Sequence, residues 1–500
     1  MKCNPGRLTP HPAMKTTPIT ILFTVLFCAI RLALPGAHAQ PTDALVRQFE
    51  EFRAKAETGD AEAQYLLGVC YENGEGVKQD YLAAINWYRK AAEQNDPSAQ
   101  NAVGRCYARG LGVKLNYREA ASWFRRAADQ NHAEAQCHLG VCYYHGRGVE
   151  QEYIQAVKWY RKAAEQHCAA AEFNLGDCYA KGRGVAKDSV AAVRWFRKAA
   201  EQGDAAGQTR LAGSYFHGEG VEKNLAAAIS WLRKAAAQNA AEAQYTLGVC
   251  YLGGDAVPKD APGAVMWFRR AAEQNHAAAQ FALAGCYYTG QGVEEDYTEA
   301  VQWLRRAAEQ NHAAAQFDLG VCYSQGLGVE MDPTEAVNWY RRSAMQNYAS
   351  AQYNLANNYA TGQGVKRDYA EAVKWLRKAA EQNHAGAQSN LGESYYDGRG
   401  IQRDYLEAVN WYRKAAEQNN AAAQNNLGVC YVKGHGVALD YVEAYAWFAL
   451  AAGTEGAGSV ADQSREALAQ MMSPDQLSRV HERIAKLRSL ITANINNNRH

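Results

Sequence analysis

Tryptophan recurs at a fixed interval of 36 residues, and this interval restricts the possible folds more than any other feature of the chain. The chain contains 11 Trp residues, which stand at positions 87, 123, 159, 195, 231, 267, 303, 339, 375, 411 and 447. A tyrosine stands sixteen residues before every one of them, and no insertion interrupts the register between residues 61 and 456. A gapless period of this length indicates eleven tandem copies of one structural unit.

Each copy is predicted to form two helices, which we call helix A and helix B. In the first copy, Leu67, Gly68 and Tyr71 have the spacing of one helical face. Gly74 ends helix A, because glycine accepts the left-handed backbone conformation that closes a helix. Asp80 then has the place of an N-cap for helix B. A single pair of helices cannot bury its apolar faces, so the copies are expected to stack into an all-α solenoid with a concave side.

The first 39 residues have the pattern of an export signal peptide. Basic residues precede the apolar run Ile19–Ile30, and a small-x-small cleavage pattern follows at Ala37–Ala39. The apolar run is shorter than the roughly 20 residues that span a bilayer. We therefore expect an exported protein, periplasmic or secreted, with no transmembrane segment in its mature chain. A signal that is retained as an N-terminal anchor is the alternative.

The repeats, residues 61–456, are expected to lie between helical caps. Residues 40–60 read as an N-terminal half-repeat cap, because Phe52, Arg53 and Ala56 repeat the pattern of the end of helix B. Residues 457–493 are predicted to form C-terminal capping helices, and residues 494–500 a disordered tail.

Charge and motifs argue against a nucleic-acid-binding protein and against an enzyme. Lys and Arg number 53 against 52 for Asp and Glu, so no basic excess indicates a nucleic-acid partner. The recurring Gly-x-Gly-Val follows a helix rather than a strand, so it is not a nucleotide-binding fingerprint. The sequence also lacks the common hydrolase, metalloprotease and phosphate-loop motifs. We therefore predict a protein without enzymatic activity and without a cofactor.

The repeated pattern Leu-Gly-x-x-Tyr, Gly-x-Gly-Val, Asp, Ala-x-x-Trp, Arg-Lys-Ala-Ala resembles the Sel1-like repeat family, a relative of the tetratricopeptide repeats. The resemblance covers about four-fifths of the chain. It implies a right-handed α/α superhelical solenoid of about eleven two-helix repeats, and it implies a scaffold that bridges protein partners. Copy six departs from the pattern, with Ala256 in place of the second loop glycine and with Pro258 and Pro262 nearby.

The relation to tetratricopeptide repeats also implies which residues line a partner-binding groove on helix A. We number the positions of each copy from one, starting at Ala61. The predicted groove consists of aromatic residues at positions five and twelve, and of polar residues at positions six and nine. These residues are Tyr65, Phe173, Tyr245, Phe281, Phe317 and Tyr353; Tyr144, Phe216, Tyr288 and Tyr396; Asn174, Asn354, Asn390 and Asn426; and Arg105, Asp177, Asn357 and Glu393. Such a groove suits an extended peptide or an inserted helix.

The cysteines are predicted to be reduced and buried. Eight of the 12 occupy the same repeat position, and equivalent atoms in successive layers lie about 8–10 Å apart, too far for a disulfide. The third copy also offers a weak candidate for a metal site, because His138, Cys142 and His145 share one helical face. Cys142 is explained by its register, so we predict no bound metal.

Other recurring side chains have simpler explanations. The Trp and Tyr rings are expected to fill the core between helices A and B. The histidines at the turns between copies, such as His276, are expected to be exposed. The Arg two residues after each of the first ten Trp residues is expected to form a weak surface pair with a Glu four residues later, as in Arg89 and Glu93.

We therefore predict an exported scaffold that binds peptide segments or domains of other proteins in its groove. The alternative is an envelope protein that binds glycan or polysaccharide through the groove aromatics.

Overall fold

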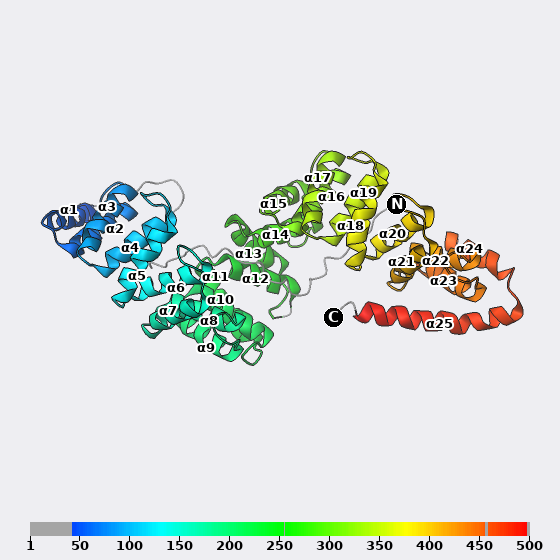
Figure 1. The fold of residues 1–500 in the computed structure, drawn as a ribbon, viewed down its shortest axis with the longest axis horizontal. Coiled ribbons are helices and arrows are strands. Elements are labelled where there is room, and N and C mark those ends of the chain that lie inside the picture. Colours follow the sequence, from blue (N-terminus) through cyan, green and yellow to red (C-terminus); the bar gives the residue numbers. More distant parts are fainter. Residues whose placement is uncertain (1–42, 255, 456–458, 498–500) are drawn as a thin grey trace. The chain divides into compact units, whose positions relative to one another are not determined.

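The computed structural model describes residues 43–254, 256–455 and 459–497, and every element in these ranges is helical or a turn (Figure 1). The predicted signal peptide, residues 1–39, lies outside the described residues. The chain divides into two compact segments, one ending at Asn116 and one beginning at Tyr117. None of the described helices is long and apolar enough to cross a bilayer.

The eleven predicted repeats each contain one helix A and one helix B. The helices A are α2 (Ala61–Asn73), α4 (Pro97–Arg109), α6 (Ala133–His145), α8 (Ala169–Lys181), α10 (Ala205–His217), α12 (Ala241–Gly253), α14 (Ala277–Thr289), α16 (Ala313–Gln325), α18 (Ala349–Thr361), α20 (Ala385–Asp397) and α22 (Ala421–Lys433). The helices B are α3 (Tyr81–Glu93), α5 (Tyr117–Asp129), α7 (Tyr153–Glu165), α9 (Ser189–Glu201), α11 (Leu225–Ala237), α13 (Ala261–Glu273), α15 (Tyr297–Glu309), α17 (Pro333–Met345), α19 (Tyr369–Glu381), α21 (Tyr405–Ala416) and α23 (Tyr441–Glu455).

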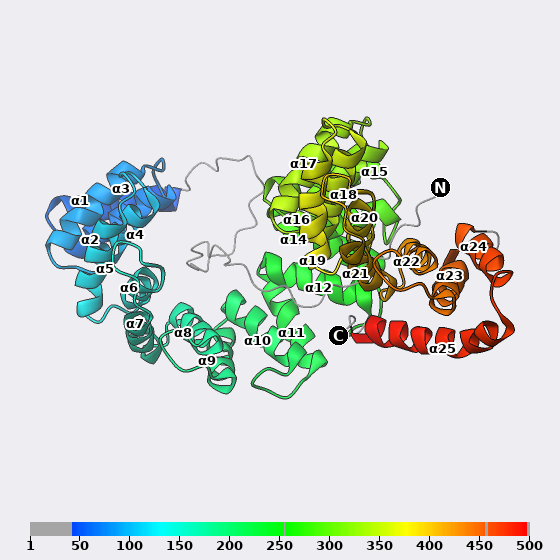
Figure 2. The same ribbon diagram turned by 45° about the vertical axis from the view of Figure 1, so that its right-hand side comes forward.

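The predicted α/α solenoid is confirmed, since each helix packs against the helices that precede and follow it within its segment (Figures 1 and 2). The predicted turn chemistry is also present. Gly74 ends α2 with a φ of 75°, and the carboxylate of Asp80 accepts from the backbone amides of Leu82 and Ala83. Copy six keeps both helices at 13 residues despite its two prolines.

Helices A and B approach each other closely at position eight. A Cβ placed on Gly248 would lie 2.5 Å from the Phe268 ring, and the corresponding distances at six other glycines are 2.5 to 2.7 Å. Where position eight is alanine, at Ala212, Ala284 and Ala356, the helix B residue opposite is leucine rather than an aromatic. The two positions therefore form one packing pair, either glycine with an aromatic ring or alanine with leucine.

A buried glutamine at position four fixes the turn between copies. The side-chain amide of Gln316 donates to the backbone carbonyl of Ala308, and its carbonyl oxygen accepts from Gln346 at 2.7 Å. The bond to the backbone carbonyl eight residues earlier occurs in all ten copies that have this glutamine. The fourth copy instead has Glu172, which cannot donate when ionised.

Consecutive copies are joined by a hydrogen bond that the sequence pattern did not predict. The guanidinium of Arg341 donates to the hydroxyl of Tyr359 in the next helix A at 3.2 Å. All ten arginines in this register make the same bond. The predicted surface pair between Arg89 and Glu93 is therefore wrong. Ala449 replaces the arginine in the last copy, where no further repeat provides a tyrosine.

The array is closed by helices at both ends. At the N-terminus, α1 (Asp43–Glu57) places Phe49 edge-on against Tyr71, with ring centroids 5.4 Å apart. At the C-terminus, α24 (Val460–Ala469) and α25 (Pro474–Asn497) both pack against α23. Arg483 of α25 pairs with Glu443 of α23 at 2.6 Å. Helix α25 continues to Asn497, four residues into the stretch that we predicted to be disordered.

We expect Gly248→Ala to destabilise the sixth repeat and Phe268→Leu to rescue it. The added methyl overlaps the Phe268 ring and costs about 1–3 kcal/mol, whereas the double variant reproduces the alanine–leucine pair of other copies. Amide hydrogen exchange of α12 in the full chain measures the local opening free energy. Gly213→Ala is the control, because no atom lies within 4 Å of a Cβ there. If the α12 amides of Gly248→Ala were as protected from hydrogen exchange as those of the wild type, the packing argument would be contradicted.

Glu172→Gln should stabilise the chain by about 1 kcal/mol at pH 8, because it restores a donor where a buried carboxylate oxygen of Glu172 has no described partner. Burial raises the pKa of Glu172. A raised pKa means that the wild type is most stable when Glu172 is protonated and loses stability as pH rises through that pKa. The difference in free energy of unfolding between Glu172→Gln and the wild type should therefore become smaller as the pH is lowered. Denaturation of both proteins between pH 4 and 8 tests this, with the exposed Glu165→Gln as the control.

Candidate functional site

The predicted groove residues all lie on helices A, but they differ in exposure. Tyr144 and Asp177 are buried, Glu393 is exposed, and the other fifteen are half-buried. The structure therefore places a row of partly accessible aromatic and polar side chains along one helix of every repeat that contributes to the prediction.

The aromatic residues at position five pack against their own repeat. The ring of Tyr245 lies 5.9 Å from the ring of Phe268 on helix B and 5.1 Å from His276 at the following turn. Phe317 has neighbours at the same two positions of its own repeat, Tyr340 on helix B and Tyr348 at the following turn. One side of each ring is thus used for packing, and the half-burial leaves the remainder accessible.

The turn histidines are not the exposed residues that we predicted. Three of them are half-buried N-caps of the next helix A, namely His276, His312 and His384. The Nδ1 atom of each accepts a hydrogen bond from a backbone amide of that helix. Burial lowers the pKa of His312 and of His384. These histidines support the position-five rings, with a centroid distance of 4.8 Å between Tyr353 and His384.

Several groove residues at positions six, nine and twelve pair across neighbouring repeats. Arg105 forms an ion pair with Glu72 at 3.0 Å, and the Tyr144 hydroxyl donates to Asp177 at 3.2 Å. The amide of Asn390 donates to Asn357 at 3.1 Å. The structure therefore brings these residues together in pairs, which the sequence pattern did not indicate.

Asp318 on α16 is a helix-A residue that the sequence pattern did not single out, because only asparagines were expected at position six. Burial raises the pKa of Asp318 to about 7. Within the described part of the chain, no hydrogen bond or ion pair reaches its carboxylate. Burial, and to a smaller extent the charge of Asp318, raises the pKa of three phenols: Tyr288, Tyr340 and Tyr348.

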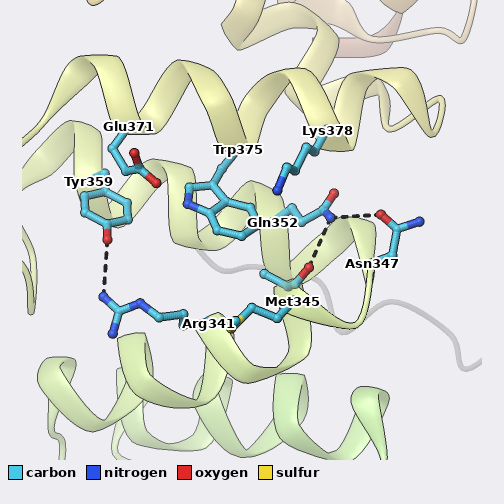
Figure 3. Close-up of a pocket in the computed structure, with 9 residues that line it drawn as sticks. Arg341, Met345, Asn347, Gln352, Tyr359, Glu371, Trp375 and Lys378 are labelled. Atoms are coloured by element: carbon cyan, nitrogen blue, oxygen red, sulfur yellow. Dashed lines mark hydrogen bonds between the residues drawn. The ribbon is translucent and has the colours of Figure 1, made fainter.

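A second surface lies between neighbouring helices B. A pocket of 530 Å³ opens between α17 and α19, where Arg341, Met345, Trp375 and Lys378 line it (Figure 3). Lys378 lies over the Trp375 ring at 4.3 Å, and Arg341 already bonds Tyr359. The Trp rings contribute to packing as predicted, but they do so between successive repeats, and a Lys or Arg three residues later covers the outer face of ten of them. In these ten repeats the ring face is therefore already occupied by a cation of the chain itself.

The described cysteines are free, and the eight in common register are buried, as predicted. The third repeat contains two further cysteines, Cys137 at position five and Cys168 at the following turn. Their thiols are hydrogen bonded to each other, which lowers the pKa of Cys168 and raises that of Cys137. Among the described residues, no three His, Cys, Asp or Glu side chains are grouped as metal ligands, and His138 instead stacks on Phe124 with a centroid distance of 4.8 Å.

Comparisons with known proteins match this geometry to one family. The family model described as the Sel1 repeat matches eleven times between residues 61 and 452. A solved protective antigen present in uropathogenic Escherichia coli strains is 35% identical, with a TM-score of 0.70; the match covers 89% of this chain and 96% of the antigen. A Sel1 repeat protein from Oxalobacter formigenes is 33% identical, with a TM-score of 0.47 over 61% of this chain and 88% of its own. No curated protein matches the chain.

We expect Cys168 to be the fastest-reacting thiol of the folded repeats. It is half-buried with a lowered pKa, whereas burial raises the pKa of Cys142 and of Cys178 to about 12. Thiolates are the reactive form, so iodoacetamide at pH 7.5 should label Cys168 first. Peptide mass mapping after short labelling measures the order, with Cys168→Ser as the control. Equal labelling of Cys168 and Cys178 would contradict the assignment.

Proposed function

Because the chain belongs to the Sel1 repeat family, whose members are generally protein-interaction scaffolds, we propose that it is an exported scaffold that binds peptide segments or domains of partner proteins along its helices A. In a stacked array of helix pairs, the helices of one type line the concave side, which gives a partner a long continuous surface.

One observation carries this proposal: the side chains that hold the array together recur in nearly every copy, whereas the half-buried residues on helix A differ from copy to copy. The arginine that bonds the next tyrosine occurs in ten of the eleven copies, and so does the glutamine at position four. Positions five, six, nine and twelve carry aromatic, amide and charged groups in changing combinations. The recurring contacts hold the array whatever these positions carry, so their variation can serve a specific partner, since specificity depends on particular side chains in particular places.

Export is the less direct part of the proposal. It is supported by the basic residues, apolar run and small-x-small pattern in the first 39 residues. The similar E. coli protein is described as a protective antigen, which is consistent with a protein outside the cytoplasm. Osmotic-shock fractionation with N-terminal sequencing tests export, and an intact N-terminus in the cytoplasmic fraction would contradict it.

Photocrosslinking in cells tests binding along helices A. Benzoylphenylalanine is introduced in place of Phe216, Tyr288 or Asn390 on helices A. We expect all three to crosslink to the same discrete protein, because each is a half-buried residue of a helix A. Matched controls carry the same group on helices B, in place of Ile154 or Leu406, which are 63% and 60% exposed.

The outcomes separate the candidate functions. Crosslinks from helix B alone would show that the assigned surface is wrong. A lack of any protein crosslink from both faces, in variants that keep their circular dichroism spectrum, would contradict the scaffold proposal and favour the glycan alternative.

A further inference from the structure

We infer that Cys137 and Cys168 of the third repeat are a redox-active pair, whose disulfide links α6 to the start of α8 and so joins the third repeat to the fourth. Cys137 lies at position five of α6, and Cys168 is the N-cap residue of α8. The inference goes beyond the proposed function, because the disulfide needs no partner protein in order to form.

Position five and the turn residue that ends the same copy are in contact in several repeats. In four copies both residues carry rings, and the ring centroids lie 4.8 to 5.4 Å apart. These ring pairs are Tyr245 with His276, Phe281 with His312, Phe317 with Tyr348, and Tyr353 with His384. Cys137 and Cys168 occupy the same two positions of the third copy. The fold therefore brings the two cysteines together by the same contact that pairs the rings elsewhere.

The two thiols are in contact within the third repeat. Cys168 packs against the buried cluster that contains Cys137, and the two thiols are hydrogen bonded to each other. Formation of a disulfide shortens this contact to about 2.05 Å between the sulfur atoms. The eight cysteines in common register differ in this respect, because they stand in successive layers that are about 8–10 Å apart.

The two thiols also differ from each other in the way that disulfide exchange requires. Cys168 is half-buried at a helix N-terminus, and its hydrogen bond with Cys137 lowers its pKa. Cys137 is 4% exposed, and the same hydrogen bond, together with burial, raises its pKa. The side-chain amide of Asn174 donates to the Cys137 sulfur at 3.6 Å, which stabilises negative charge on that sulfur. Cys168 is therefore the attacking thiol, and Cys137 is the thiol that completes the exchange.

Oxidation proceeds by two exchange steps with a small-molecule disulfide such as oxidised glutathione. The Cys168 thiolate attacks one sulfur of the oxidant, so that a mixed disulfide forms at Cys168 and the first glutathione thiolate leaves. Cys137 then gives its proton to water, its sulfur bonds to the Cys168 sulfur, and the mixed disulfide breaks to release the second glutathione thiolate. Overall the two cysteines lose two electrons and two protons, and the oxidant takes them up as two thiols.

Treatment of the reduced, folded full chain with excess oxidised glutathione at neutral pH tests the pair. The reaction is quenched with acid, and the remaining thiols are alkylated in denaturant before digestion with trypsin. Trypsin leaves Cys137 and Cys142 on one peptide and Cys168 and Cys178 on another. We expect mass spectrometry to find these two peptides joined by a disulfide, with the other described cysteines alkylated.

Serine variants identify the two sulfurs that are joined. The double variant Cys142→Ser, Cys178→Ser should keep the joined peptides, since serine already occupies this register at Ser214 and Ser394. Cys168→Ser should abolish them. Loss of the joined peptides in the double variant would overturn the inference, and so would glutathione that stays on Cys168 without a disulfide to the other peptide.

The disulfide should also make opening of the third repeat rarer. The loop that it closes contains all of α7, and closing a loop restricts the unfolded chain. Amide hydrogen exchange of α7 should therefore slow by at least about tenfold on oxidation. Exchange of α19, in a distant repeat, should stay the same, and Cys168→Ser should show no effect of the oxidant on α7. Equal exchange of α7 in the oxidised and reduced chains would show that the disulfide does not join the two repeats.

Discussion

The contact between position eight of helix A and the residue opposite it on helix B is the constraint on which the rest of the repeat depends. A Cβ on Gly320 would lie 2.7 Å from the Tyr340 ring, so only a glycine, or an alanine facing leucine, permits this helix separation. At that separation, Gln316 reaches the carbonyl of Ala308 and the turn closes. The same separation presents one stripe of helix A to the preceding repeat and leaves the neighbouring stripe partly open to solvent.

Most of the fold could be predicted from the sequence because its determinants are local and repeated. The 36-residue interval, the glycine after each helix A and the aspartate before helix B are signals that act within one copy. The expectation of a scaffold came from the same pattern, because that pattern resembles a family whose members are generally protein-interaction scaffolds. Phe52 and Arg53 preserve the register of helix B, so the sequence indicated a helical cap before the first repeat. Helix α25 has no equivalent in the repeats, and the sequence analysis placed its C-terminal end too early.

The bonds between copies could not be predicted, because they depend on distances between residues far apart in the chain. In most copies a Glu follows the arginine by four residues, which suggested a pair within one helix, yet the tyrosine hydroxyl of the next repeat is the partner. The turn histidines looked exposed because they lie between helices, although their imidazoles cap the next helix. Asp318 became noticeable only when its surroundings were known, since the sequence cannot show that an acid lacks a counter-charge.

The arginine-to-tyrosine bond also gives the array a direction. Every internal repeat has a donor toward its C-terminal neighbour and an acceptor toward its N-terminal neighbour, so any two internal copies present matching surfaces. Duplication or loss of a whole internal repeat would therefore preserve this bond at every junction, so an array of this kind can change its length in steps of one repeat. A copy added after the eleventh would lack this bond, because Ala449 cannot donate a side-chain hydrogen bond to the tyrosine of the added copy.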